Sequence, residues 1–337
     1  MVEVDATSRD ILRALSEDCR RSASSLAKEV HCAPKTLKKK LARLENEYEI
    51  RYTLELDARE LGFSAPYFVL VKFSKPIDET LLQQALKQYP FAQFAALTKG
   101  DFDLVVYVLA KNALDFVRWS NYFRQTLSEY IEHWEGGLVT GHWFGFFPLN
   151  EDILEYADLD ERDRIMLRVL LRNAKIPISD LARRMNVPVS TMQYHLKKLF
   201  AMKAVRRATI VMEKGPYPVH YVGLYGYKMT KKFMRHGLSI RSFLTTEGTY
   251  EPVNRLLFEF NVAATTFDDV TVYSSTDLDE GHDFHKKMLE LCGPELRDHK
   301  SAFILKVVKG SLPVRKLDMK RGYQAKGVHI YDYIEKD

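Results

Sequence analysis

The chain has 337 residues, of which 46% are hydrophobic and 28% charged, so it is long enough for two to four globular domains. No apolar run approaches the ~18–20 residues that cross a bilayer, and the first residues are neither basic nor apolar enough for a signal peptide, which argues against membrane-spanning and secreted proteins. The net charge is only +5, and the three cysteines lack disulfide or metal-ligand spacing, so we expect a cytoplasmic protein.

Residues 1–60 have the pattern of a winged helix-turn-helix domain. A first helix is predicted to begin at Asp5, a residue type that caps helices, and a short second helix covers residues 22–30. A tight turn then leads into a third helix over residues 34–47. Residues 50–56 alternate in polarity like a wing strand, so we expect three helices and a strand pair.

Residues 61–150 change to a pattern in which strands and helices alternate. The predicted strands are 66–73, 91–98, 102–109 and 138–147, and the predicted helices are 78–88 and 113–127. This βαββαβ order is that of a ferredoxin-like sandwich, in which two helices cover one face of a sheet. The bare face must be buried, and a second copy is the usual cover.

The helix-turn-helix pattern recurs later in the chain. When Asp5 is placed over Asp160, 47 positions align without a gap, and 12 of them are identical. The second domain covers residues 158–214, with its third helix at 189–202 and its wing strand at 205–212. It carries 13 Lys and Arg against 6 Asp and Glu, whereas residues 1–60 carry 12 of each, so the excess positive charge lies in this segment and favours a polyanionic partner.

Residues 215–310 have a divergent form of the sandwich pattern. The predicted strands are 219–229, 256–265, 270–274 and 303–309, with one helix at 278–291. The segment from Thr266 to Tyr273 resembles the segment from Gly100 to Tyr107, but no first helix can be placed between Thr230 and Asn254. Residues 311–337 form a C-terminal extension that matches nothing in the first half.

The two third helices are the candidate DNA-reading elements, because a short helix, a tight turn and a second helix with exposed basic residues form the usual major-groove device. The expected contact residues are Lys35, Thr36, Lys38, Lys39, Lys40 and Arg43 in the first copy, and Ser190, Thr191, Gln193, Tyr194, Lys197 and Lys198 in the second. Lys38 or Lys39 would suit guanine acceptors, and Gln193 would suit adenine edges. A simply solvated charged face is the alternative.

The wing arginines Arg51, Arg206 and Arg207 are further candidates, for contacts to the DNA backbone or the minor groove. A protein with two such DNA-reading domains would be associated with the nucleoid.

Two groups of motifs resemble the Lrp/AsnC family, the feast-famine regulators. Residues 159–163, 178–182 and 190–205 are similar to the family's winged helix, and residues 98–107 are similar to the loop and third strand of its effector-binding RAM domain. The resemblance covers about residues 3–147 and 158–310. It implies a transcriptional regulator, commonly archaeal, in which RAM sheets pair face to face. It also implies an amino-acid effector near Gly100, Asp101 and Asp103, positions for which a plain tight turn is the alternative.

Three departures from the family pattern affect what the resemblance implies. Two units in one chain imply an α+β fold in which two winged helix-turn-helix and two RAM-like domains form an intrachain pseudo-dimer, with a homodimer or higher oligomer as a further step. The family's adjacent arginines are replaced by Lys39-Lys40 and Tyr194-His195, so base preference does not carry over. The second RAM-like domain has Thr266-Phe-Asp in its loop, which puts a second effector site in doubt.

Other functions compete with that of a regulator. The first is an architectural protein that coats or bends DNA. Another is an enzyme like the sirohaem decarboxylases, for which the candidates are His133, His142 and His220, although that group's histidine-bearing strand motif is not found. We expect no enzyme activity and no cofactor.

Two further patterns suggest binding sites that we do not expect. His282, His285 and His299 could share a metal ion, but exposed helix histidines are the favoured interpretation. Residues 142–147 could be an aromatic stacking platform for nucleic acid, but core strand packing is favoured.

Overall fold

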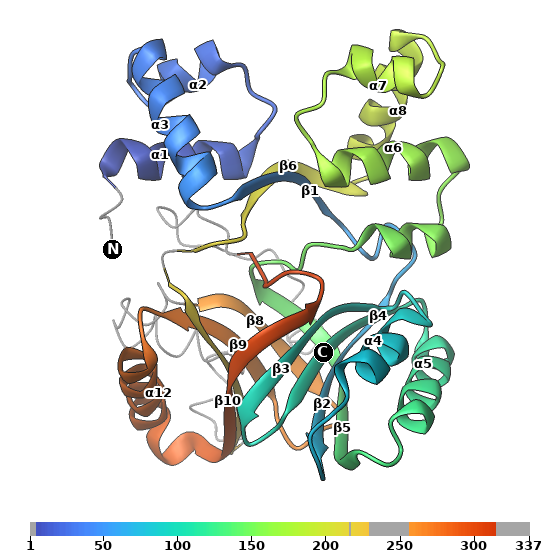
Figure 1. The fold of residues 1–337 in the computed structure, drawn as a ribbon, viewed down its shortest axis with the longest axis vertical. Helices are drawn as coiled ribbons and strands as arrows, with labels where there is room; N and C mark the ends of the chain where they lie inside the picture. Colours follow the sequence, from blue (N-terminus) through green and yellow to red (C-terminus); the bar gives the residue numbers. More distant parts are fainter. Residues whose placement is uncertain (1–4, 216, 229–255, 315–337) are drawn as a thin grey trace, which may run out of the picture.

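Two helix-turn-helix units lie on the same side of a single β-barrel (Figure 1). The computed structural model describes residues 5–215, 217–228 and 256–314. The predicted gap in the second sandwich, between Thr230 and Asn254, lies outside the described residues, as does nearly all of the C-terminal extension. Within the described part, no helix combines the length and hydropathy that crossing a membrane requires.

The two helix-turn-helix units repeat each other element by element. The first contains α1 (Ala6–Glu17), α2 (Ala23–Glu29) and α3 (Pro34–Glu47), and the second contains α6 (Glu161–Arg172), α7 (Ile178–Arg184) and α8 (Val189–Ala201). The first helices start alike: the Asp5 carboxylate accepts from the Ser8 amide at 3.1 Å and the Asp160 carboxylate from the Asp163 amide at 2.8 Å. The turns also match, because His31 and Asn186 both have left-handed backbone, with φ of 50° and 51°.

The strands that follow these units correct one expectation. Each unit has one strand, β1 (Ile50–Leu56) or β6 (Val205–Met212), and the two pair antiparallel with each other. The predicted strand pair within each copy is therefore wrong. Thr53 and Thr209 are cross-strand partners, and their hydroxyls donate to the other unit's first helix, at Leu171 O (2.8 Å) and Ser16 O (2.7 Å). The exchanged strands form a ribbon that ties the units together (Figure 1).

The barrel is closed by eight strands from two halves. The first half contributes β2 (Ala65–Phe73), β3 (Ala92–Gly100), β4 (Leu104–Ala110) and β5 (Ile131–Phe144); the second contributes β7 (Val219–Tyr227), β8 (Leu256–Ala263), β9 (Asp269–Ser275) and β10 (Leu296–Lys309). The order around the barrel is β10-β3-β4-β2-β5-β8-β9-β7. Each half has the ferredoxin-like strand order, and each half's last strand pairs with the other half's second strand. The predicted fold class and intrachain pseudo-dimer are confirmed.

Aromatic side chains from both halves meet inside the barrel. The ring centroids of Phe68 and Phe260 are 5.1 Å apart, and Phe147 lies 4.6 Å from Tyr107 and 4.5 Å from Phe258. Phe146 and Phe147 are buried, as the core interpretation of residues 142–147 expected. The bare sheet faces thus cover each other.

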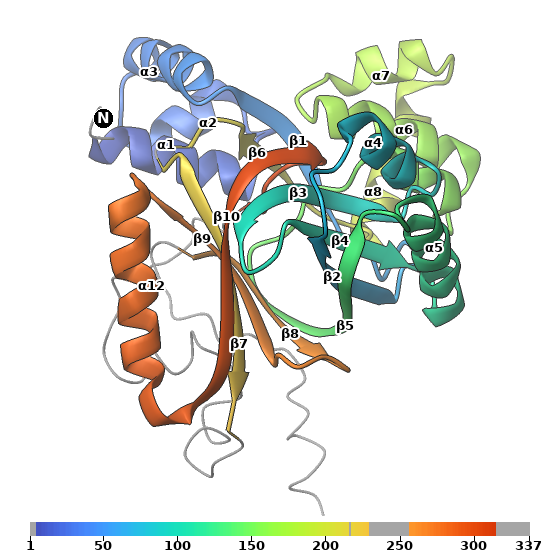
Figure 2. The ribbon, with the colours of Figure 1, turned by 60° about the horizontal axis from the view of Figure 1, so that its bottom comes forward.

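Helices cover the outside of the two sheets. In the first half these are α4 (Glu79–Lys87) and α5 (Ala113–Thr126), and in the second half α12 (Leu278–Cys292); Figure 2 shows them on opposite flanks of the barrel. Short 3-10 helices, η1 (Glu151–Tyr156) and η2 (Gly293–Glu295), precede α6 and β10. Both last strands begin earlier than predicted, β5 at Ile131 and β10 at Leu296, because the mostly polar segments that start there pair with β2 and β7.

Candidate nucleic-acid interface

Helix α3 presents a basic face to solvent. Pro34 occupies the first turn, where its missing amide costs no hydrogen bond, and Leu37 and Leu44 anchor the helix in the core. The exposed residues are Lys35, Thr36, Lys38, Lys39 and Arg43, while Lys40 is half-buried. Within the described part of the chain, Lys35, Lys38 and Lys39 form no ion pair, so their charges are available to an external anion.

Helix α8 presents a more mixed face. Met192, Leu196 and Leu199 are buried, which leaves Ser190, Gln193, Tyr194 and Lys197 exposed and Thr191 and Lys198 half-buried. Tyr194 is 66% exposed, so its side chain does not pack in the core. Nine of the twelve residues predicted on α3 and α8 are exposed, and Lys40, Thr191 and Lys198 are half-buried; the contacts of all twelve with DNA stay a prediction.

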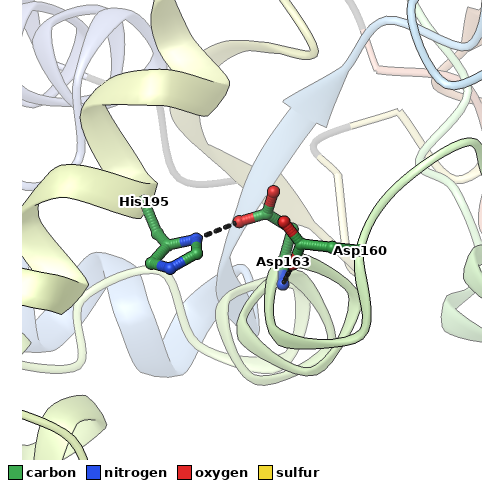
Figure 3. Close-up of side chains that lie close together, drawn as sticks. All are labelled: Asp160, Asp163 and His195. Carbon is green, nitrogen blue, oxygen red and sulfur yellow. Dashed lines mark hydrogen bonds and ion pairs between the residues drawn. The ribbon is translucent and has the colours of Figure 1, made fainter.

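A polar contact fixes α8 to the start of α6 (Figure 3). The His195 ring lies 2.7 Å from the fully buried Asp163 carboxylate, and the Lys198 ammonium lies 2.7 Å from Asp163 and 3.0 Å from Asp160. In the first unit, Lys40, which aligns with His195, contacts Asp5, which aligns with Asp160, at 2.6 Å. Lys40 and Lys198 therefore link α3 and α8 to the first helices of their own units.

Asp160, Asp163 and His195 lie close enough to hold a metal ion. However, the Lys198 ammonium already lies against both carboxylates, and its positive charge would oppose a metal cation there. Asp160 also caps α6, so its oxygens have backbone partners as well. The group is therefore best explained as a link between helices rather than a metal centre.

This link should make the second unit sensitive to acid. Burial opposes ionisation of Asp160, but the Asp163 amide and the Lys198 ammonium outweigh it and lower its pKa from 3.8 to about 2. Because the pKa is lower in the folded state, the stabilisation is complete above pH 4 and is lost as the pH falls from about 4 to 2. We expect the melting temperatures of the wild type and Asp160→Asn to differ at pH 6 and to converge by pH 2. A constant difference would contradict this.

The wing arginines all form ion pairs along the ribbon. Arg206 contacts Asp57 at 2.6 Å, Arg207 contacts the buried Glu55 at 2.5 Å, and Arg51 contacts Glu213 at 2.8 Å. Each pair joins one of the two strands to the other strand or to the residue that directly follows it. These arginines stabilise the ribbon, and their contact with DNA stays a prediction.

In the loop that carries Gly100, Asp101 and Asp103, both carboxylates are hydrogen-bonded to backbone amides of the protein. The Asp101 carboxylate accepts from the Ser301 amide at 2.7 Å, and the Asp103 carboxylate accepts from the Phe73 amide at 2.9 Å. A side chain on Gly100, where φ is 153°, would lie 2.4 Å from Ser301 O. Gly100 and Asp101 thus lie against β10 and Asp103 is held by β2, and effector binding there remains a prediction.

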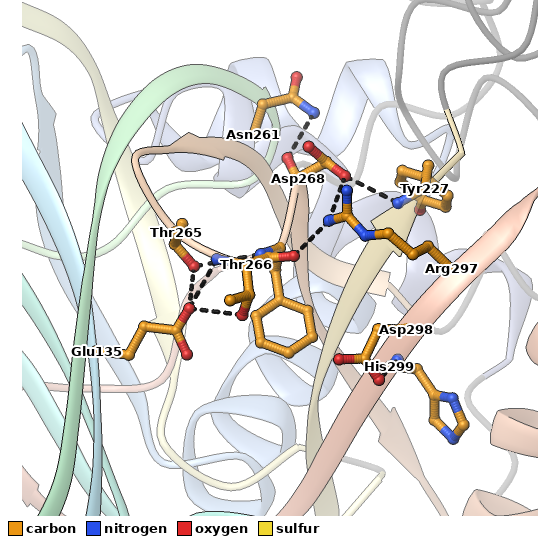
Figure 4. Close-up of polar contacts among 10 residues, drawn as sticks. Glu135, Tyr227, Asn261, Thr265, Thr266, Asp268, Arg297, Asp298 and His299 are labelled. Atoms are coloured by element: carbon orange, nitrogen blue, oxygen red, sulfur yellow. Dashed lines mark hydrogen bonds and ion pairs between the residues drawn. The ribbon is translucent and has the colours of Figure 1, made fainter.

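The matching loop of the second half has a different register from the one that the sequence indicated (Figure 4). Asp268, not Asp269, takes the place of Asp103: its carboxylate accepts from the Tyr227 amide at 2.8 Å. One extra residue in the hairpin, with Ala264 at φ 64°, causes the shift. The sequence comparison missed it because both positions are aspartate.

This second loop is held by the first half of the barrel. Glu135 on β5 accepts hydrogen bonds from the Thr266 amide at 2.8 Å and from the Thr265 and Thr266 hydroxyls (Figure 4). Burial opposes ionisation of Glu135, but these hydrogen bonds outweigh it and lower its pKa. Both loops therefore take part in closing the barrel.

Family comparisons agree with the two helix-turn-helix units. Residues 4–45 match the AsnC-type helix-turn-helix domain, and residues 159–199 match the winged helix-turn-helix DNA-binding domain. An uncharacterized HTH-type transcriptional regulator of Pyrococcus furiosus is 36% identical over 62 residues, which are 18% of this chain and 38% of that protein.

Solved structures resemble either the whole chain or one of its units. The siroheme decarboxylase NirDL has a TM-score of 0.58 with 14% identity, covering 92% of this chain and 94% of that chain, so the likeness concerns the fold alone. The structure of AsnC from E. coli has a TM-score of 0.37 with 20% identity and covers 41% of this chain and 93% of its own.

Proposed function

We propose that the chain is a sequence-specific regulator of transcription of the Lrp/AsnC type that reads double-stranded DNA through α3 and α8, a proposal supported by the two helix-turn-helix matches and by the similar HTH-type regulator. The observation that carries the proposal is that both helices expose their polar faces while the ribbon holds the two units on one side of the barrel (Figure 1). A rigid pair of reading helices suits two half-sites on one face of a duplex.

The two helices would make different kinds of contact with DNA. The lysines of α3 that have no ion pair in the described structure suit phosphates or guanine, whereas Gln193 and Tyr194 on α8 offer one amide and one aromatic ring. The half-sites should therefore differ and form an imperfect palindrome.

Two double variants test this division on a duplex selected from a random pool. Lys38→Ala/Lys39→Ala should weaken binding to every duplex and lower the slope of log affinity against log salt by about 2, about 1 for each lost phosphate contact. Gln193→Ala/Tyr194→Ala should reduce the preference for the selected duplex over a scrambled one by about tenfold or more. Fluorescence anisotropy over a range of salt concentrations measures both effects.

A matched control is Lys286→Ala/Lys287→Ala, which removes two adjacent exposed lysines from α12 on the barrel. It should leave affinity and salt slope nearly unchanged. Equal affinity of the wild type for unrelated duplexes would instead indicate an architectural DNA-binding protein. If the α12 variant weakens binding as much as the α3 variant, the assigned surface is wrong.

The remaining parts of the proposal concern partners. Support for an amino-acid effector comes only from family resemblance at the Gly100 loop, and the nucleoid is the location that a DNA-bound regulator would have. We propose no enzymatic step. Aromatic side chains meet inside the barrel. Of the candidate histidines, His133 is exposed on β5 and His220 is half-buried, and burial lowers the pKa of His220 to about 4.

A further inference from the structure

Helices α5 and α12 occupy equivalent places in the two halves of the barrel, so each serves as a reference for the other. Both follow the third strand of their half, and both start at a polar cap: Asn112 accepts from the Asp115 amide at 3.0 Å and Asp277 from the Glu280 amide at 2.8 Å. Aligning the caps places His282 over Val117 and His285 over Ser120.

The last strands, β5 and β10, can be aligned in the same way. Trp134 pairs with Val71 and His299 pairs with Tyr225. The carbonyls of Val71 and Tyr225 are equivalent, because each accepts from the amide of its half's loop aspartate, at 2.9 Å. His299 therefore stands where the first half has Trp134.

The contact between the helix and the last strand is aromatic in the first half, between α5 and β5, and is made by histidines in the second half, between α12 and β10. In the first half Trp134 packs on Trp119 and Phe123, with ring centroids 5.9 and 5.6 Å apart. In the second half His285 and His299 face each other with centroids 5.7 Å apart. Three histidines thus replace a valine, a serine and a tryptophan at neighbouring positions.

We propose that His285 and His299, joined by His282, bind a divalent transition-metal ion such as Zn²⁺. A tetrahedral ion at about 2.1 Å from two imidazole nitrogens holds their ring centroids about 5 Å apart, close to the separation observed. His282 precedes His285 by three residues on the same helix and is exposed, so its ring is free to turn toward the ion.

The chemical state of His285 suits a metal ligand. Its Nδ1 atom is buried and has no hydrogen-bond partner, which is a cost that a bound ion would remove. Burial, followed by the neighbouring rings of His299 and His282, lowers its pKa to about 4, although Asp101 partly opposes this. The ring is therefore neutral at pH 7, the form that binds metals.

The site is accessible from solvent and lies next to the contact that closes the barrel. His282 and His299 are exposed, so an ion can enter from solvent. His299 lies two residues before Ser301, whose amide is held by Asp101 of the first half. An ion bound there would stiffen the strand that closes the barrel.

The test uses the full chain without an affinity tag, stripped with a chelator and titrated with Zn²⁺ by calorimetry at pH 7. We expect one ion per chain with a dissociation constant of micromolar or below, and at least tenfold weaker binding in His285→Ala and in His299→Ala. Co²⁺ gives a second readout, because a tetrahedral site produces visible absorption that both variants should lose. His299 is exposed, so its variant should fold normally.

Two control variants make the outcome decisive. His133→Ala removes an exposed histidine, 62% accessible, from the first half and should leave binding unchanged. His195→Gln probes the other metal-compatible group, at the start of α6. The proposal is overturned if no stoichiometric binding occurs, if His285→Ala/His299→Ala binds like the wild type, or if binding is lost in His195→Gln.

Discussion

Replacing Phe147 with alanine is expected to lower the free energy of unfolding of the barrel by about 3–5 kcal/mol, the usual cost of a large cavity in a packed core. Phe147 is 6% exposed, and its ring contacts Phe94 and Tyr107 from the first half and Phe258 from the second. The substitution removes contacts that hold the two sheets together, so the loss should affect the whole barrel.

Tryptophan fluorescence during urea denaturation measures this effect. All three tryptophans of the chain, Trp119, Trp134 and Trp143, belong to the first half, so the signal reports on the barrel and not on the helix-turn-helix units. Leu305→Ala is the control, because Leu305 lies on β10 but is 64% exposed and should change the stability by less than about 0.5 kcal/mol. Similar losses in both variants would mean that Phe147 does not join the halves.

Changing the spacing between the two DNA half-sites is expected to reduce affinity by about a hundredfold, which is about 2.7 kcal/mol. The ribbon holds α3 and α8 at one separation, through the paired strands and through the contacts of Arg206 with Asp57 and Arg207 with Glu55. An insertion of about five base pairs turns one half-site to the opposite face of the duplex, so only one unit can then bind.

Binding to a second duplex distinguishes a rigid ribbon from a flexible linker. An insertion of about ten base pairs restores the face but moves the half-site by about 34 Å. A rigid ribbon should tolerate neither insertion, whereas a flexible linker would recover most of the affinity on the longer one. A ribbon variant, Glu55→Ala/Asp57→Ala, should bind the original duplex more weakly and discriminate less between spacings. Recovery of the wild type on the longer duplex would contradict a rigid ribbon.

The sequence by itself determined the local elements. Asp5 and Asp160 marked the starts of their helices, and the spacing of Leu37, Leu44, Met192 and Leu199 showed which faces of α3 and α8 are buried. These signals arise within a few residues, because helix caps and amphipathic spacing act over one or two turns. For the same reason the βαββαβ order of the first half and its divergent, incomplete repeat in the second were recognised, and the repeat predicted a pseudo-dimer.

Only the tertiary structure decided how the two copies join. The exchange of β1 and β6, the closure of the barrel by β3 with β10 and β5 with β8, and the link from Asp163 to His195 all bring distant segments together. A strand's own pattern fixes which side chains face inward but not which strand lies beside it, because edge hydrogen bonds are made by the backbone and are the same for every partner. The pseudo-symmetric packing of the two halves therefore decides which strands lie side by side and pair.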